Sequence, residues 1–236
     1  TVLTTYDCSA AGFHPTEATL ATAVNKELLL WDVAAERVAC TLLAQRHAHR
    51  RAVSSLQYAS AAAHHMLATC APDGFIALWD TRERTPERPA LVLDCQREPA
   101  TRLAWSRFGA VLASAHRADI TFWDVRRAQQ PLLHRHTAHV APIAELDWSH
   151  TSSTEMLSAA QDRLVKLWDV SVLSEPRKRD ALQLGAPVVA VRFAPFGPAV
   201  LTVTRSDAHA GQLWASHHLA APVHTFGEDA AGALAD

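Results

Sequence analysis

Apolar and polar residues alternate along short segments of this chain, as they do in strands with one buried face. Four such segments follow one another in residues 142–184: PIAELDW, EMLSAAQ, RLVKLWDV and DALQL. Residues 54–94 repeat the order with SSLQY, HMLATCA, GFIALWD and ALVLD. No stretch keeps a helical period over three turns. The pattern predicts an all-β protein assembled from sets of four strands.

Two series of aromatic residues recur with a common period. The first series ends the segments LLLWD, IALWD, ITFWD, VKLWD and QLWA, with tryptophans 48, 44, 45 and 46 residues apart at Trp31, Trp79, Trp123, Trp168 and Trp214. The second lies 18 to 21 residues before the first, at Phe13, Tyr58, Trp105, Trp148 and Phe193. A period of this length is typical of the four-stranded blade of a WD40 β-propeller.

The repeats therefore predict one propeller domain over residues 1–236 with five recognisable blades. We expect the blades at approximately 6–46, 47–98, 99–138, 139–185 and 186–227, and a tail at 228–236.

A polar set accompanies two of the repeats. In WD repeats, a His before the first strand, a Ser or Thr in the second, an Asp in the next turn and the Trp of the third form a chain of hydrogen bonds. The fourth unit supplies His139, Ser158, Asp162 and Trp168, and the second supplies His49, Thr69, Asp73 and Trp79. The other three units have Asn25, Arg117 and Ala208 in place of the Asp, so we expect packing to stabilise those blades more than the polar chain does.

Composition narrows the possible functions. With 22 basic and 24 acidic side chains the net charge is −2, which does not indicate a nucleic-acid binder. Charges or His interrupt the apolar runs before the roughly 18 residues of a membrane span, and TVLTTYDCSA is unlike a signal peptide, so we expect a soluble cytosolic protein. The missing initial Met suggests a piece of a longer protein.

The residues that could carry chemistry favour neither an enzyme nor a metal site. Cys8, Cys40, Cys70 and Cys95 lack zinc-site spacing, and no glycine-rich phosphate loop is present. Three histidine clusters are present: His47 with His49, His64 with His65, and His134 with His136 and His139. The strand pattern does not bring histidines of different blades together in one metal site. We expect no catalytic residues, no cofactor and no metal.

Basic residues cluster after the Trp-Asp pairs, and we place them in the loops that join the third and fourth strands. They are Arg82, Arg84, Arg88, Arg126, Arg127, Arg177, Lys178 and Arg179. Equivalent loops of successive blades emerge on one face, so these cations are expected to form an arc on one rim. The arc is either a solvated loop face or a docking edge for an acidic partner or an anionic membrane surface.

Longer motifs resemble one WD-repeat subunit of the SEA complex, called GATOR in animals. They are AHVAPIAELDW (138–148), LSAAQDRLVKLWD (157–169), VRFAPFGPAVLTVT (191–204) and APVHTF (221–226). The resemblance covers roughly residues 45–227 and implies a seven-bladed propeller with RWD, solenoid and RING-like parts beyond it. It also implies a non-catalytic scaffold that binds other propeller or solenoid subunits and positively regulates target-of-rapamycin signalling in response to amino acids, peripherally at the vacuole or lysosome membrane.

An alternative resemblance stays open. LATCAPDGFIALWDTR (67–82), with Asp73, Trp79, Asp80 and Arg82, fits the pattern of WD-repeat substrate receptors of the cullin-4 ubiquitin ligase, and WDVR (123–126) is a looser match. A generic WD-repeat adaptor has the same fold.

Overall fold

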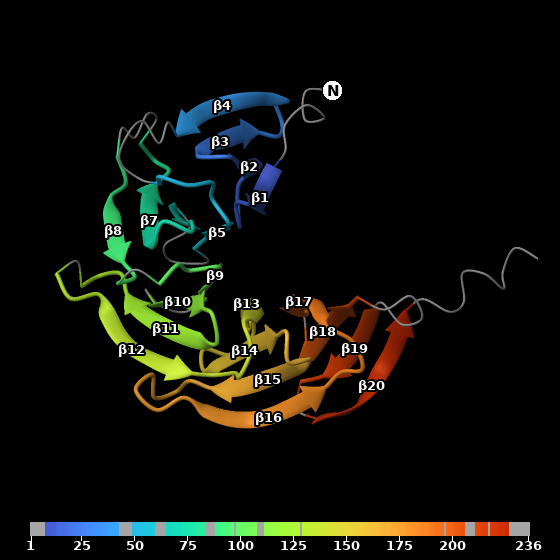
Figure 1. Cartoon of the computed structure of the whole chain (residues 1–236). Helices are drawn as coiled ribbons and strands as arrows, with labels where there is room; N and C mark the ends of the chain where they lie inside the picture. Colours follow the sequence, from blue (N-terminus) through green and yellow to red (C-terminus); the bar gives the residue numbers. More distant parts are fainter. Residues whose placement is uncertain are drawn as a thin grey trace, which may run out of the picture. The chain divides into compact units, whose positions relative to one another are not determined.

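The structure is a computed structural model that describes residues 8–42, 49–59, 65–83, 88–96, 98–107, 111–127, 129–195, 197–205, 211–216 and 218–226. Across these ranges the chain forms β-strands and no helix, and the strands make five four-stranded sheets. In each sheet the strands are hydrogen-bonded in chain order (Figure 1). The predicted all-β propeller of five four-stranded blades is confirmed.

Each sheet is one blade, and the blades are numbered along the chain. Blade 1 contains β1 (Cys8–Phe13), β2 (Thr19–Val24), β3 (Glu27–Asp32) and β4 (Arg37–Leu42). Blade 2 contains β5 (Ser55–Tyr58), β6 (Met66–Cys70), β7 (Phe75–Asp80) and β8 (Leu91–Asp94). Blade 3 contains β9 (Arg102–Trp105), β10 (Val111–His116), β11 (Asp119–Asp124) and β12 (Leu132–Thr137). Blade 4 contains β13 (Ile143–Trp148), β14 (Glu155–Ala160), β15 (Leu164–Asp169) and β16 (Arg177–Gln183). Blade 5 contains β17 (Val188–Phe193), β18 (Ala199–Thr204), β19 (Gly211–Ala215) and β20 (His218–Phe226).

The chain divides into two compact units. The first consists of Thr1–His116 with Trp123–Leu132, and the second of Arg117–Phe122 with Leu133–Asp236. Blades 1 and 2 thus belong to the first unit, blades 4 and 5 to the second, and blade 3 contributes to both.

In the first unit the apolar core lies between successive sheets. Leu28 and Leu30 of blade 1 pack in one cluster with Leu56 and Trp79 of blade 2. A second cluster joins blade 2 to the strands of blade 3 and includes the wholly buried Leu112. Within the central strand β7, the consecutive residues 76–79 are all buried, so side chains on both faces of the blade are apolar and each face is covered by a neighbouring sheet.

In the second unit the same arrangement joins blades 4 and 5. Leu157, Leu167 and Leu182 of blade 4 share a buried cluster with Val191 and Trp214 of blade 5. Each of the five is at most 7% exposed. In the described residues, each core cluster therefore combines side chains of two consecutive repeats.

The aromatic residues that end the first strands pack against the preceding blade. Trp105 donates its indole N–H to the carbonyl of Gln57 at 3.1 Å, and Trp148 meets Phe122 edge-on with ring centroids 6.2 Å apart. Tyr58 and Phe193 are equally buried, whereas Phe13 at the end of β1 is 70% exposed. The second aromatic series thus marks the blade-to-blade contact in four of its five positions.

Candidate functional site: polar networks and exposed cations

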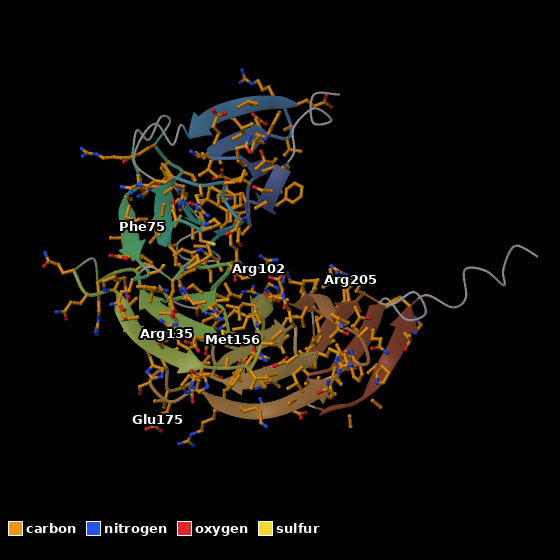
Figure 2. All side chains as sticks on the ribbon, viewed as in Figure 1. Phe75, Arg102, Arg135, Met156, Glu175 and Arg205 are labelled. Carbon is orange, nitrogen blue, oxygen red and sulfur yellow. The ribbon has the colours of Figure 1, made fainter. Side chains whose placement is uncertain are left out.

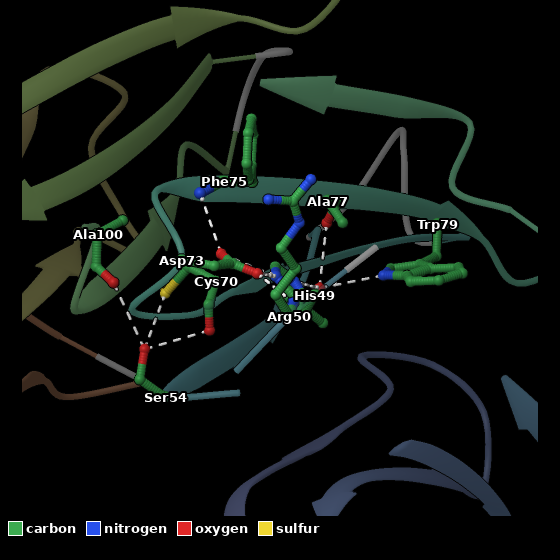
Figure 3. A network of polar contacts seen from close by, with 10 residues as sticks. His49, Arg50, Ser54, Cys70, Asp73, Phe75, Ala77, Trp79 and Ala100 are labelled. Atoms are coloured by element: carbon green, nitrogen blue, oxygen red, sulfur yellow. Dashed lines mark hydrogen bonds and ion pairs between the residues drawn. The ribbon is translucent and has the colours of Figure 1, made fainter. Parts of the chain in front are cut away.

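Blade 2 contains the first complete hydrogen-bond chain (Figure 3). The indole of Trp79 donates to the hydroxyl of Thr69 at 3.1 Å, and that hydroxyl lies 2.9 Å from Nε2 of His49. Nδ1 of the same imidazole lies 3.2 Å from the carboxylate of Asp73. Asp73 also accepts the main-chain N–H groups of Arg50 at 2.6 Å and Phe75 at 3.2 Å. The carboxylate therefore holds both the imidazole and the turn that precedes β7.

Blade 4 repeats this chain with Ser in place of Thr. Trp168 donates to Ser158 at 2.8 Å, and Ser158 lies 2.7 Å from Nε2 of His139. Nδ1 of His139 lies 3.0 Å from Asp162, which also accepts the N–H of Leu164 at 3.0 Å. All eight side chains named from the sequence therefore lie in two hydrogen-bonded sets of four.

Burial keeps both imidazoles neutral. Desolvation lowers the pKa of His49 below its ordinary value, although the charge of Asp73 acts to raise it. Desolvation lowers the pKa of His139 as well, against the opposing effect of Asp162. A neutral ring donates through one nitrogen and accepts through the other, so Nδ1–H donates to the carboxylate and Nε2 accepts the hydroxyl proton.

Blade 3 contains a different hydrogen-bond chain, which we did not predict from the sequence. Trp123 donates to Ser114 at 2.7 Å, and Ser114 lies 2.7 Å from Nε2 of His116, two residues further along the same strand. Nδ1 of His116 lies 3.0 Å from the carbonyl of Glu98. The expectation that packing dominates here is therefore incomplete, because this blade completes the chain with a His from its own second strand and a main-chain acceptor.

Among the described residues, blades 1 and 5 show only the first link. Trp31 donates to Thr22 at 2.8 Å, and Trp214 donates to Thr202 at 3.0 Å. Across a strand pair, the Trp is diagonal to the hydroxyl residue two positions along, a separation that long side chains can span. Position 208, where the Asp of blade 5 would lie, is outside the described residues.

Turn length explains why blades 1 and 3 lack the Asp. Two residues join their second and third strands, and the first of the two adopts a positive φ, 55° at Asn25 and 51° at Arg117. The turns of blades 2 and 4 are longer, and their positive-φ residues are Gly74 and Arg163. Only the longer turn leaves room for a carboxylate ahead of the positive-φ residue to cap the next strand.

Two further polar residues join successive blades. The side-chain oxygen of Gln57 accepts the main-chain N–H of Trp105 at 2.9 Å, and the carboxylate of Asp147 accepts that of Phe193 at 2.7 Å. Burial raises the pKa of Asp147. Sequence reasoning missed both, although each is a polar residue one position before an aromatic of the second series.

Three predicted cations of the first unit pair with the Asp of a Trp-Asp motif. Arg82 forms two hydrogen bonds from Nε and Nη2 to Asp80, and Arg126 forms the same pair to Asp124 at 2.9 and 3.0 Å. These hydrogen bonds lower the pKa of both carboxylates. Arg127 approaches Asp124 at 3.5 Å. The three guanidinium groups remain 66–72% exposed, so such pairs contribute little stability and leave the cations accessible.

In the second unit the cations lie in a strand. β16 begins at Arg177, so Arg177, Lys178 and Arg179 are its first residues, and the prediction that they lie in the preceding loop is wrong. Their side chains are exposed because the strand is the fourth in its sheet order. Arg177 pairs with Glu175 at 3.8 Å, and Glu175 extends away from the ribbon (Figure 2). Arg179 contacts Glu155.

The remaining candidates are distributed as follows. Arg88 is exposed, whereas Arg84 lies outside the described residues, as do His47 and His64. Within the described ranges, no three His, Cys, Asp or Glu side chains converge as metal ligands would. The same ranges contain no helix with the length and hydropathy of a membrane span.

Comparison with known proteins identifies the domain. The profile of the family described as "Nucleolar protein 10-like, N-terminal domain", a β-propeller family, matches residues 8–177. The chain belongs to this family of β-propeller domains. The match covers blades 1 to 3 and most of blade 4.

Curated relatives add a second line of similarity. The chain is 30% identical over 213 residues to a WD repeat-containing protein of Dictyostelium discoideum, and 29% identical over 215 residues to the GATOR2 complex protein Wdr59 of Drosophila melanogaster. Each alignment covers 88% of this chain but only 11% and 21% of the relatives, respectively. The predicted resemblance to a GATOR subunit is confirmed at the level of homology.

A solved structure supports the fold alone. A chain of the "Crystal Structure of Mitotic Checkpoint Complex" superposes with a TM-score of 0.76 at 18% identity. The superposition covers 92% of this chain and 62% of that chain.

Proposed function

We propose that this domain is a non-catalytic scaffold in a SEA/GATOR-like complex that positively regulates target-of-rapamycin signalling in response to amino acids. Its similarity over 88% of its length to a GATOR2 complex protein is the observation that carries the proposal. Its partners are other propeller or solenoid subunits, and its place is peripheral, at the vacuole or lysosome membrane.

The physical properties of the described residues support a binding role. The repeats use a Thr or Ser, a His and an Asp side chain to hold blades 2 and 4, so these groups satisfy one another in the interior. Charged side chains of both signs remain on the surface, where they can meet a partner.

Affinity purification of the tagged full-length protein, followed by mass spectrometry, tests the proposal. We expect other WD-repeat and solenoid subunits in constant proportion. A monodisperse protein that recovers no such subunit from cells with or without amino acids contradicts it.

The exposed cations are proposed to dock an acidic surface of a partner. Arg126→Glu with Arg127→Glu should reduce partner recovery by about tenfold, a loss of roughly 1.4 kcal/mol. Asp124 is 4% exposed and loses both cations in this variant, so the doubly neutral variant Arg126→Gln with Arg127→Gln controls for folding. Arg205→Glu, at another exposed position, changes the net charge by the same amount as the doubly neutral variant and controls for that change. Equal recovery with all three variants refutes the docking role.

A second candidate function is that of a substrate receptor of a cullin-4 ubiquitin ligase. The observation that favours it is the matched geometry of the Asp80–Arg82 and Asp124–Arg126 pairs in successive blades. Recovery of the ligase adaptor in the same purification, and its loss with Arg82→Ala, would support this candidate over the scaffold.

A further inference from the structure

A cleft of about 390 Å³ opens in the first unit between blades 1 and 2. Blade 1 contributes the β1–β2 loop, the start of β2 and parts of β3 and β4, and blade 2 contributes the end of β5 and the loop after β7. The residues that line it are His14, Glu17, Thr19, Leu30, Arg37, Ala39, Tyr58, Thr81 and Glu83. A volume of this size accommodates one long side chain.

One of the residues that line the cleft has an unsatisfied polar group. Tyr58 is 6% exposed, and its hydroxyl is the one buried side-chain N or O without a hydrogen-bond partner in the described part of the chain. The ring is held in place by an edge-on contact with His14, with centroids 4.9 Å apart. Buried hydroxyls are normally paired, so this one indicates a group that enters the cleft.

The surroundings of the hydroxyl favour a ligand that donates hydrogen bonds. Burial, and then the nearby charge of Glu17, raises the pKa of Tyr58, so the phenol is neutral and its oxygen can accept. The hydroxyl of Thr81 already donates to the carbonyl of His65 at 2.9 Å, which leaves its lone pairs for a donor. Glu17 and Glu83 add two carboxylates, and both are exposed at the rim.

Charge also favours a cation. Among the lining side chains, two carboxylates stand against the single guanidinium of Arg37. Asp32 lies opposite Arg37 across the β3–β4 pair, where an opposite charge offsets that of the guanidinium. The cleft therefore presents several acceptors around one buried phenol.

We propose that the cleft between blades 1 and 2 binds an arginine side chain of a partner polypeptide. Glu17 and Glu83 accept from the guanidinium at the rim, and the oxygen of Tyr58 accepts one of its N–H groups at the floor. A planar group with five donors matches this set better than a compact ammonium ion does. An anionic ligand would instead use Arg37 and would be repelled by both carboxylates.

The test is a titration of the ¹⁵N-labelled 236-residue chain with Nα-acetyl-arginine amide at low salt, followed by the amide resonances of residues 14, 16–19 and 81–83. We expect saturable shifts there. Glu17→Gln and Glu83→Gln should each weaken binding about three- to tenfold, and Tyr58→Phe about threefold. Glu27→Gln, an exposed carboxylate of blade 1 outside the cleft lining, should change binding less than twofold.

Two further probes make the result decisive. Nα-acetyl-citrulline amide has the same shape without the charge and should bind at least tenfold more weakly than the arginine probe. Equal binding of the two, or saturable binding of Nα-acetyl-glutamate amide at the same resonances, overturns the proposal. Unchanged thermal melting of the Gln and Phe variants excludes loss of folding as the cause.

That the ligand belongs to a partner polypeptide rests on the proposed scaffold function. Direct titration measures arginine binding in the cleft when no complex is present. A titration without binding, alongside normal co-purification, therefore refutes only the proposed arginine site. Arginine binding in the titration, with no co-purified subunits, refutes only the proposed scaffold function.

Discussion

Replacement of Asp162 by Ala probes the polar chain of blade 4 at its outer end. The wild-type carboxylate accepts from Nδ1 of His139 and from the main-chain N–H of Leu164, both at 3.0 Å. His139 is 3% exposed, so water cannot replace the lost acceptor without opening the blade. The truncation leaves a buried N–H of the imidazole without a partner.

The size of the effect follows from these two contacts. An unsatisfied buried donor costs about 1–3 kcal/mol, and the hydrogen bond to Leu164 at the partly exposed turn adds about 0.5–1 kcal/mol. We therefore expect Asp162→Ala to lower the free energy of unfolding by about 1.5–4 kcal/mol. In a domain of this length, each kcal/mol corresponds to a fall of about 2–4 °C in melting temperature.

Equilibrium urea unfolding, followed by tryptophan fluorescence, measures the loss. Asp169→Ala is the matched control, because Asp169 in the same blade accepts the N–H of exposed Ser171 at 2.9 Å and should cost less than about 1 kcal/mol. A double-mutant cycle with His139→Ala should give a coupling energy above about 1 kcal/mol. Equal losses for the two Asp variants, or no coupling, would refute the role of the polar chain.

Three further predictions concern buried titratable groups. Folding lowers the pKa of His49 and His139, so their full contribution to stability is present above the unfolded pKa of 6.5. Below that pH the free energy of unfolding falls by up to about 1.4 kcal/mol per pH unit for each histidine. Urea unfolding at pH 7.5 and 5.5 measures the difference. Burial raises the pKa of Asp147, so Asp147→Asn should retain an acceptor for Phe193 and match or exceed the wild type by about 1 kcal/mol at pH 7, a difference that shrinks as pH falls. Tyr58→Phe removes an unpartnered hydroxyl and should leave the melting temperature unchanged or raise it.

Each of these has a contrary outcome. Stability that is constant between pH 7.5 and 5.5 in the wild type, or a slope that His139→Gln does not reduce, contradicts the first. An Asp147→Asn gap that widens on acidification contradicts the second. A loss of more than about 1 kcal/mol in Tyr58→Phe contradicts the third, because the hydroxyl would then have a partner in the folded state.

The sequence by itself determined the architecture and two of the polar networks. Each repeat carries its own alternation, its own Trp and its own first-strand aromatic, so the signals are local and occur five times. The chains of blades 2 and 4 were predictable because Asp follows the hydroxyl residue by four positions in both. Hydrogen-bond register within one sheet converts such fixed spacings into contacts.

Only the tertiary structure decided which blades depart from the pattern. His116 replaces the missing His of blade 3 because residues two apart on one strand share a face, and the carbonyl of Glu98 lies within reach of its ring. Arg177 is the first residue of β16, although the sequence around it resembles a loop.

Contacts between blades also needed the structure. The cleft around Tyr58 joins residues of two repeats, and the hydrogen bonds that Gln57 and Asp147 accept join residues 48 and 46 positions apart. Within a repeat, the covalent chain and the sheet register constrain which side chains meet. Between repeats, the meeting depends on how two sheets pack, and a periodic sequence contains no local signal for that.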